Sequence, residues 1–85
     1  MHWKNINNTI TKTYVFSGFE QAMQFMQEAS SIIIALDHHP KWTNTYNKIE
    51  IVLSTHDIGN KVGPKDYELA DKLDYLFTLS NKENK

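Results

Sequence analysis

Apolar and polar residues alternate in two stretches of the chain, and the first of these is residues 9–16. The segment is rich in β-branched and aromatic side chains, so we expect a strand, although Lys12 interrupts its apolar row. Residues 3–6 are interpreted as a short preceding strand, with Asn7 and Asn8 as the turn between the two. The apolar row consists of Ile10, Tyr14 and Phe16.

The second alternating stretch is residues 49–56, and it predicts a strand with one buried face. Residues 42–46 are the expected partner strand, joined to it by a turn near Asn47. His56 falls on the polar face, at the end of the strand. The apolar row is Ile49, Ile51 and Leu53, and the polar row includes Glu50 and Ser54.

Between these stretches, apolar residues recur at helical spacing and predict one long amphipathic helix over about residues 19–37. Ser17 and Glu20 have the spacing of a capping box at its start. The helix is expected to end near Asp37, because Pro40 disfavours helical backbone at His39. The apolar stripe is Phe19, Ala22, Met23, Met26, Ala29, Ile33 and Leu36, and we interpret Met23, Phe25 and Met26 as core residues.

A second helix is predicted over about residues 64–80, beginning at Pro64 after a glycine-containing loop over residues 57–63. The polar tail, residues 80–85, is expected to fray. The element order β-β-α-β-β-α fits an α+β domain, an antiparallel sheet with its helices packed on one face. The apolar stripe of the second helix is Leu69, Ala70, Leu73, Leu76 and Phe77.

Composition narrows the possible functions. The 85 residues suit one small domain, residues 1–85, and no cysteine is present, which excludes thiol catalysis and cysteine-ligated metals. Nine lysines, no arginine and a net charge of −1 argue against nucleic-acid binding. No apolar run reaches the ~20 residues needed to cross a membrane, and no signal peptide is visible, so we expect a cytoplasmic protein.

Histidine is the most informative residue type, because three of the four histidines fall at predicted element ends. His38 and His39 lie where the long helix stops, and His56 lies where the last strand stops, flanked by Asp37 and Asp57. Imidazole is the natural proton donor or acceptor near neutral pH. A solvated helix end and a capped turn remain the simpler explanations. A metal site is disfavoured, since adjacent histidines rarely chelate one ion.

The run of three isoleucines at residues 32–34 covers too wide an arc of helix to face a single core. At least one of these side chains is therefore exposed or buried against another subunit. We favour a subunit interface, because so small a domain gains stability from self-association.

Several blocks of the sequence together resemble the pterin-4a-carbinolamine dehydratases. The resemblance covers about residues 3–77 and is most specific in the His-His-Pro-x-Trp block and the later Thr-His-Asp block. It implies a four-stranded antiparallel sheet with two or three helices packed on one face, and association into homodimers or homotetramers. The matching blocks are Asp37–Trp42, Tyr46–Lys48, Ser54–Asp57, Lys65–Asp66 and Leu69–Ala70, with Trp3, Phe16, Phe19 and residues 22–26.

The resemblance also implies an activity. Family members dehydrate 4a-hydroxytetrahydropterin to quinonoid dihydropterin without a metal or an organic cofactor, which recycles the pterin used by aromatic amino acid hydroxylases. Carried over to this chain, His38, His39 and His56 are the active-site histidines. We assign His38 and His56 as the acid/base pair and His39 to pterin binding. Residues matched to the lining or support of the pocket are Trp3, Asp37 and Asp66, with Asp57 beside His56.

The chain departs from the family pattern in two places. Ile34 stands where the family usually has a polar residue, one helical turn before His38. The loop from His56 to Asp66 is one residue longer than usual, and Gly63 and Pro64 replace the customary cap, which leaves open whether Asp66 keeps its place. A protein-binding or scaffold module with little catalytic activity is the alternative function, and Ile34 with its isoleucine neighbours is compatible with it.

Overall fold

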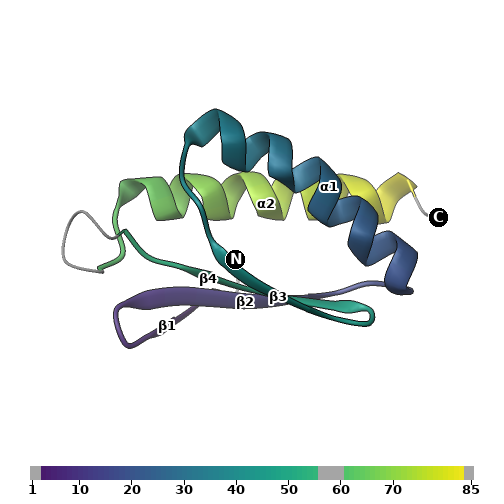
Figure 1. Cartoon of the computed structure of the whole chain (residues 1–85), viewed down its shortest axis with the longest axis horizontal. Helices are drawn as coiled ribbons and strands as arrows, with labels where there is room; N and C mark the ends of the chain where they lie inside the picture. Colours follow the sequence, from purple (N-terminus) through teal and green to yellow (C-terminus); the bar gives the residue numbers. More distant parts are fainter. Residues whose placement is uncertain (1–2, 56–60, 84–85) are drawn as a thin grey trace.

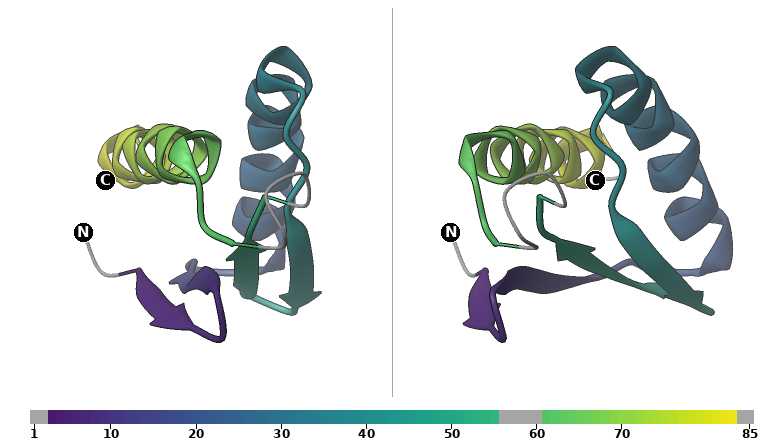
Figure 2. Two further views of the ribbon diagram at one scale, coloured as in Figure 1. Left: turned by 90° about the vertical axis from the view of Figure 1, so that its left-hand side faces the viewer. Right: turned by 60° about the vertical axis from the view of Figure 1, so that its left-hand side comes forward.

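The computed structural model describes residues 3–55 and 61–83, which form a four-stranded antiparallel sheet covered by two helices (Figure 1). Figure 2 shows from two further directions that both helices lie on the same side of the sheet. The predicted α+β fold is confirmed, with two helices in the described residues. In chain order the elements are β1 (Lys4–Ile6), β2 (Thr9–Val15), α1 (Phe19–Leu36), β3 (Lys41–Thr45), β4 (Lys48–Leu53) and α2 (Pro64–Glu83).

The sheet is two hairpins joined through their long strands, in the order β1-β2-β4-β3. Ile6 pairs with Thr9, so Asn7 and Asn8 form the two-residue turn expected there, and both have positive φ. Thr45 pairs with Lys48, which places the second turn at Tyr46 and Asn47. Strand β3 begins and ends one residue earlier than predicted, whereas β4 begins at Lys48 and ends at Leu53, before the residues of the Thr-His-Asp block.

The core lies between the sheet and the helices and follows the alternation of the strands. Tyr14 pairs with Ile49 and Ile10 with Leu53, and all four side chains are buried. Thr13 and Glu50 form the neighbouring pair on the opposite face of the sheet and are exposed. The fully buried side chains of greatest volume are Tyr14, Phe25, Ile49, Ile51, Leu53, Leu69, Leu73 and Asp66.

Two predictions about helix ends are wrong. The N-cap of α1 is Gly18, not Ser17, and no side-chain hydrogen bond caps the helix, so the Ser17–Glu20 spacing does not form a capping box. Helix α2 continues to Glu83 instead of ending near residue 80. Residues 80–83 contain no glycine or proline, and a polar sequence can extend a helix that is already nucleated. Among the described residues, neither helix combines the length and apolarity that a membrane span requires.

Candidate active site

The end of α1 determines where the two adjacent histidines lie. Asp37 follows the last helical residue in the left-handed conformation, with φ 50° and ψ 45°. The N–H of Asp37 donates to the carbonyl of Ile34, and the N–H of His38 to that of Ile33, which is the Schellman closure of a helix. The chain turns sharply here, so His38 is 9% exposed whereas His39 lies on the surface.

The side chain of His38 contacts a carboxylate from the other helix, α2. Asp66, in the first turn of α2, is fully buried at 0% exposure, and its Oδ1 lies 2.5 Å from Nε2 of His38. The other oxygen, Oδ2, accepts hydrogen bonds from Thr55 Oγ1 at 2.7 Å and from the N–H of Gly63 at 2.8 Å. Asp66 is therefore bonded to His38 from the first turn of α2.

This arrangement fixes which nitrogen of His38 faces the protein. An ionised carboxylate can only accept hydrogen bonds, so with Asp66 ionised the N–H of His38 Nε2 is the hydrogen-bond donor. Nδ1, on the opposite side of the ring, is then the atom that can take a proton or, in the imidazolium, give one. The side chain of His38 is 11% exposed, so a small part of it remains in contact with solvent.

The structure does not bring all the predicted site residues together with His38. His39 and Asp37 are exposed on either side of it in the chain. His56 and Asp57 lie outside the described residues. Within residues 3–55 and 61–83, no group of three or more His, Asp or Glu side chains is arranged to hold a metal ion.

Trp3, predicted to line the pocket, belongs to a different polar cluster. Its indole Nε1 donates to Oδ2 of Asp74 at 3.0 Å, and Asp74 lies on α2, ~12 Å along the helix axis from Asp66. Lys12 Nζ and the hydroxyl of Tyr14 both reach Oδ1 of Asp74, at 2.7 and 2.6 Å. Lys12 interrupts the apolar row of its strand because it points toward this carboxylate, and that interruption was the one sequence signal for the cluster.

The cluster shifts the ionisation of two of its members. Burial alone would raise the pKa of Asp74, but hydrogen bonds from Lys12, Tyr14 and Trp3, together with the charge of Lys12, hold that pKa below its usual value. Burial, and then the hydrogen bond to the Asp74 carboxylate, raise the pKa of Tyr14. The phenol therefore stays protonated and the carboxylate ionised, as expected for a structural hydrogen-bond network.

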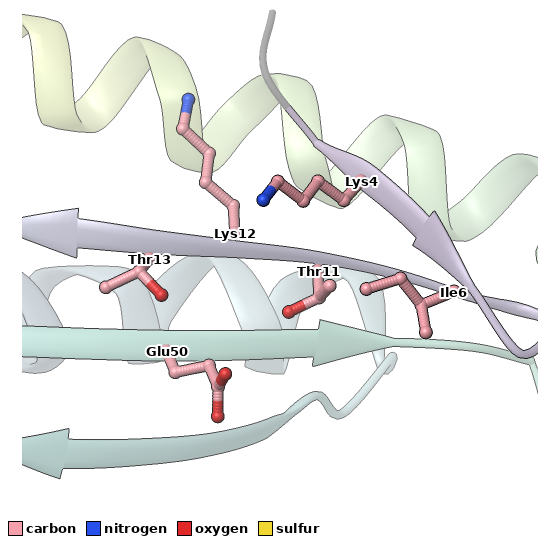
Figure 3. A pocket seen from close by; sticks show the side chains of 6 residues that line it. All are labelled: Lys4, Ile6, Thr11, Lys12, Thr13 and Glu50. Carbon is pink, nitrogen blue, oxygen red and sulfur yellow. The ribbon is translucent and has the colours of Figure 1, made fainter.

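A separate hollow lies on the sheet, between strands β1, β2 and β4 (Figure 3). Its volume is about 390 Å³. No histidine is among its lining residues, so this hollow is separate from the site formed by His38 and Asp66. Its lining residues are Lys4, Ile6, Thr11, Lys12, Thr13 and Glu50.

Comparison with known proteins gives a consistent result. A family profile described as "Pterin 4 alpha carbinolamine dehydratase" matches residues 1–76. A protein of Opitutus terrae, named as an inferred pterin-4-alpha-carbinolamine dehydratase, is 43% identical over 74 residues, covering 87% of this chain and 76% of its own length. A similarly named protein of Bradyrhizobium diazoefficiens is 40% identical over 80 residues, covering 92% of this chain and 79% of its own.

Two solved structures are similar in fold. The transcriptional coactivator/pterin dehydratase of Brucella melitensis aligns with a TM-score of 0.83 and 34% identity, covering 87% of this chain and 80% of its own. A pterin dehydratase-like protein identified as a RuBisCO assembly factor in the alpha-carboxysome aligns with a TM-score of 0.73, covering 89% of this chain and 87% of its own. Its identity of 16% supports the shared fold alone.

Proposed function

Because this chain belongs to the pterin 4 alpha carbinolamine dehydratase family, we propose that it dehydrates 4a-hydroxytetrahydropterin, with His38 as one of its two acid/base groups. The proposal includes the recycling of the pterin that aromatic amino acid hydroxylases use. The observation that carries it is the hydrogen bond between His38 Nε2 and the buried carboxylate of Asp66.

The reaction needs two proton transfers. The bond between C4a and its hydroxyl breaks, and a proton delivered to that oxygen lets it leave as water. The proton on N5 is lost to a base, and the electrons of the N–H bond form the C4a=N5 double bond of quinonoid dihydropterin. A group that titrates near neutral pH suits either step, and a positioned proton transfer contributes about 10²–10⁴-fold in rate.

In this proposal His38 uses Nδ1 for one of these transfers, because Nε2 is bonded to Asp66. The second acid/base group is His56, assigned from the sequence. His39 binds the pterin ring from the surface beside His38, and Asp66 holds the His38 ring in one tautomer and one orientation.

The proposal is tested by following the absorbance change of quinonoid dihydropterin formation when purified protein meets freshly generated 4a-hydroxytetrahydropterin. His38→Ala and His56→Ala are each expected to lower the rate by about 10² or more. Asp71→Asn, an exposed change on α2, serves as the control and should leave the rate unchanged. Parent-like rates in both histidine variants would rule out the acid/base assignment.

A protein-binding or scaffold role is the second candidate, and one observation favours it. Ile34, the apolar residue one turn before His38, is 72% exposed, as expected for a residue that contacts another protein. Stoichiometric capture of a partner by the parent and its loss in Ile34→Glu, together with no dehydration above the uncatalysed rate, would favour this role over catalysis.

A further inference from the structure

Thr55 bonds the carboxylate that holds His38. The residue follows β4, and its hydroxyl lies 2.7 Å from Oδ2 of Asp66. A threonine hydroxyl beside a carboxylate must donate its single proton, since the carboxylate has none to give. Thr55 therefore binds the oxygen of Asp66 that His38 does not use.

Thr55 is itself held in place by the backbone. Its N–H donates to the carbonyl of Lys61 at 2.8 Å, and the two residues form an isolated antiparallel bridge just before α2. The backbone of Thr55 is thus held in place, and a single side-chain rotation, χ1, directs its hydroxyl to Asp66.

Three donors approach Asp66 from three segments of the chain. His38 comes from the turn after α1, Thr55 from the segment after β4, and the N–H of Gly63 from the residue before α2. The Thr55 and Gly63 bonds occupy Oδ2 and so fix the rotation of the carboxylate about its bond to Cβ. With that rotation fixed, Oδ1 faces His38.

We propose that Thr55 is a positioning residue of this site, whose hydroxyl orients Asp66 so that His38 keeps its Nε2–H tautomer and presents Nδ1 to the substrate. The inference rests on the proposed function for its catalytic consequence, but its structural part concerns only Thr55, Asp66 and His38. Thr55 does not touch the reacting atoms in this proposal, so its effect must pass through the imidazole.

The test compares Thr55→Val, Thr55→Ala and Thr55→Ser with the parent. Val keeps the shape of threonine, Ala makes the site less crowded, and Ser restores the hydroxyl without the methyl group. Because both Val and Ala remove the hydroxyl, the result does not depend on the folding of one variant. Thr43→Val, on the exposed face of β3, is the matched control for the same chemical change.

Two measurements are made on each protein. Steady-state kinetics should show kcat about tenfold lower in the Val and Ala variants, with KM changed little, and parent-like values in the Ser variant. Nitrogen-15 NMR of the imidazole rings, assigned with His38→Gln, should show the Nε2–H tautomer of His38 in the parent and in Thr55→Ser. The Val and Ala variants should show a mixture of tautomers.

The two measurements separate the possible failures. If the parent has no dehydratase activity, the proposed function fails, and the tautomer of His38 alone decides the role of Thr55. An unchanged tautomer and unchanged kcat in Thr55→Val and Thr55→Ala would overturn the inference. Equal losses in Thr55→Ser and Thr55→Val would also overturn it, because the hydroxyl would not be the cause.

Discussion

At the scale of single residues, the backbone conformation of Asp37 positions His38. Asp37 is exposed, and its left-handed conformation lets α1 stop and the chain turn inward at His38. Asp and Asn enter this conformation more readily than most residues, and glycine enters it without a steric penalty. Asp37 therefore suits this position because its backbone tolerates positive φ.

The free energies of unfolding of Asp37 variants should rank by how well each new residue tolerates positive φ. Asp37→Gly is expected to keep the free energy of unfolding within about 1 kcal/mol of the parent, whereas Asp37→Val lowers it by about 1–2 kcal/mol. Urea unfolding followed by circular dichroism measures both. Asp71→Val, the same change at an exposed helical position, should have little effect. Equal stability of the Gly and Val variants would contradict the argument.

The different environments of His38 and His39 show which features of the site could be predicted from the sequence and which could not. The prediction that both lie at a helix end followed from Pro40 and is confirmed by α1 ending at Leu36. Which of the two histidines is buried depends on the backbone at Asp37, where φ is positive. The spacing of apolar residues along the chain does not indicate the sign of that angle. The bond from His38 to Asp66 joins residues 28 apart and depends on how the two helices pack.

At the scale of elements, the start of α1 offers a site for stabilisation. Gly18 caps this helix with extended backbone, which any residue adopts, and no side chain satisfies the first N–H groups. A Cβ added at Gly18 would lie 3.0 Å from Oε1 of Gln21, the mobile end of a long side chain that can move aside.

Gly18→Ser should therefore raise the free energy of unfolding by about 0.5–1 kcal/mol, through a new capping hydrogen bond and a less flexible unfolded chain. Gly18→Ala is the matched control, because it restricts the unfolded chain equally but supplies no oxygen. Thermal unfolding of the three proteins separates the two contributions. If the Ala variant is as stable as the Ser variant, the hydroxyl does not cap the helix.

Helix α2 is fixed to the rest of the molecule by two carboxylates with different surroundings. Asp66 binds the turn after α1 and the segment after β4, and Asp74 binds β2 and the residue before β1. Each carboxylate accepts three hydrogen bonds, so each connects segments that are distant in sequence to helix α2. These bonds complement the apolar stripe of α2, which packs on the sheet.

The lowered pKa of Asp74 predicts a specific loss of stability in acid. A carboxyl group whose folded pKa lies below its unfolded value stabilises the fold above the unfolded pKa of ~3.9, and that contribution is lost as the pH falls through the folded pKa. Asp74→Asn should lower the free energy of unfolding at pH 7 by about 1–3 kcal/mol.

The pH dependence distinguishes this effect from a simple loss of packing. Urea unfolding at several pH values should show that the parent loses stability more steeply than Asp74→Asn below pH ~4. Asp71→Asn, which removes an exposed carboxylate from the same helix, should keep the parent's slope. Parallel slopes in the parent and Asp74→Asn would show that this carboxylate is not held below its usual pKa.

At the scale of the whole molecule, the fold was largely predictable and the site only in part. Strand alternation placed Ile49, Ile51 and Leu53 in the core, and the structure buries all three. Such patterns are local, and the hydrophobic effect acts on every residue of the row. The site depends on single polar contacts such as Thr55 to Asp66, which no repeat along the chain encodes. The resemblance identified Asp66, but it did not give the partner of each oxygen.

Self-association is the remaining prediction at this scale. It concerns the three isoleucines at residues 32–34, which differ in how far each is exposed. Ile33 is buried, Ile32 packs partly against the core, and Ile34 is 72% exposed at the end of α1. A domain of 85 residues buries a modest share of its surface by itself, so a second copy of the chain is the expected cover for Ile34. Burial of one isoleucine contributes about 1.5–3 kcal/mol, or roughly 10–100-fold in the dissociation constant.

Ile34→Glu should therefore weaken self-association by at least about tenfold, because it replaces a buried apolar contact with a charge that must be desolvated. Sedimentation velocity over a range of concentrations measures the change in mass distribution. Gln27→Glu places the same charge on an exposed position two turns earlier in α1 and should leave the distribution unchanged. A parent protein that stays monomeric at high concentration, or an Ile34→Glu variant that associates like the parent, would mean that no second copy covers this side chain.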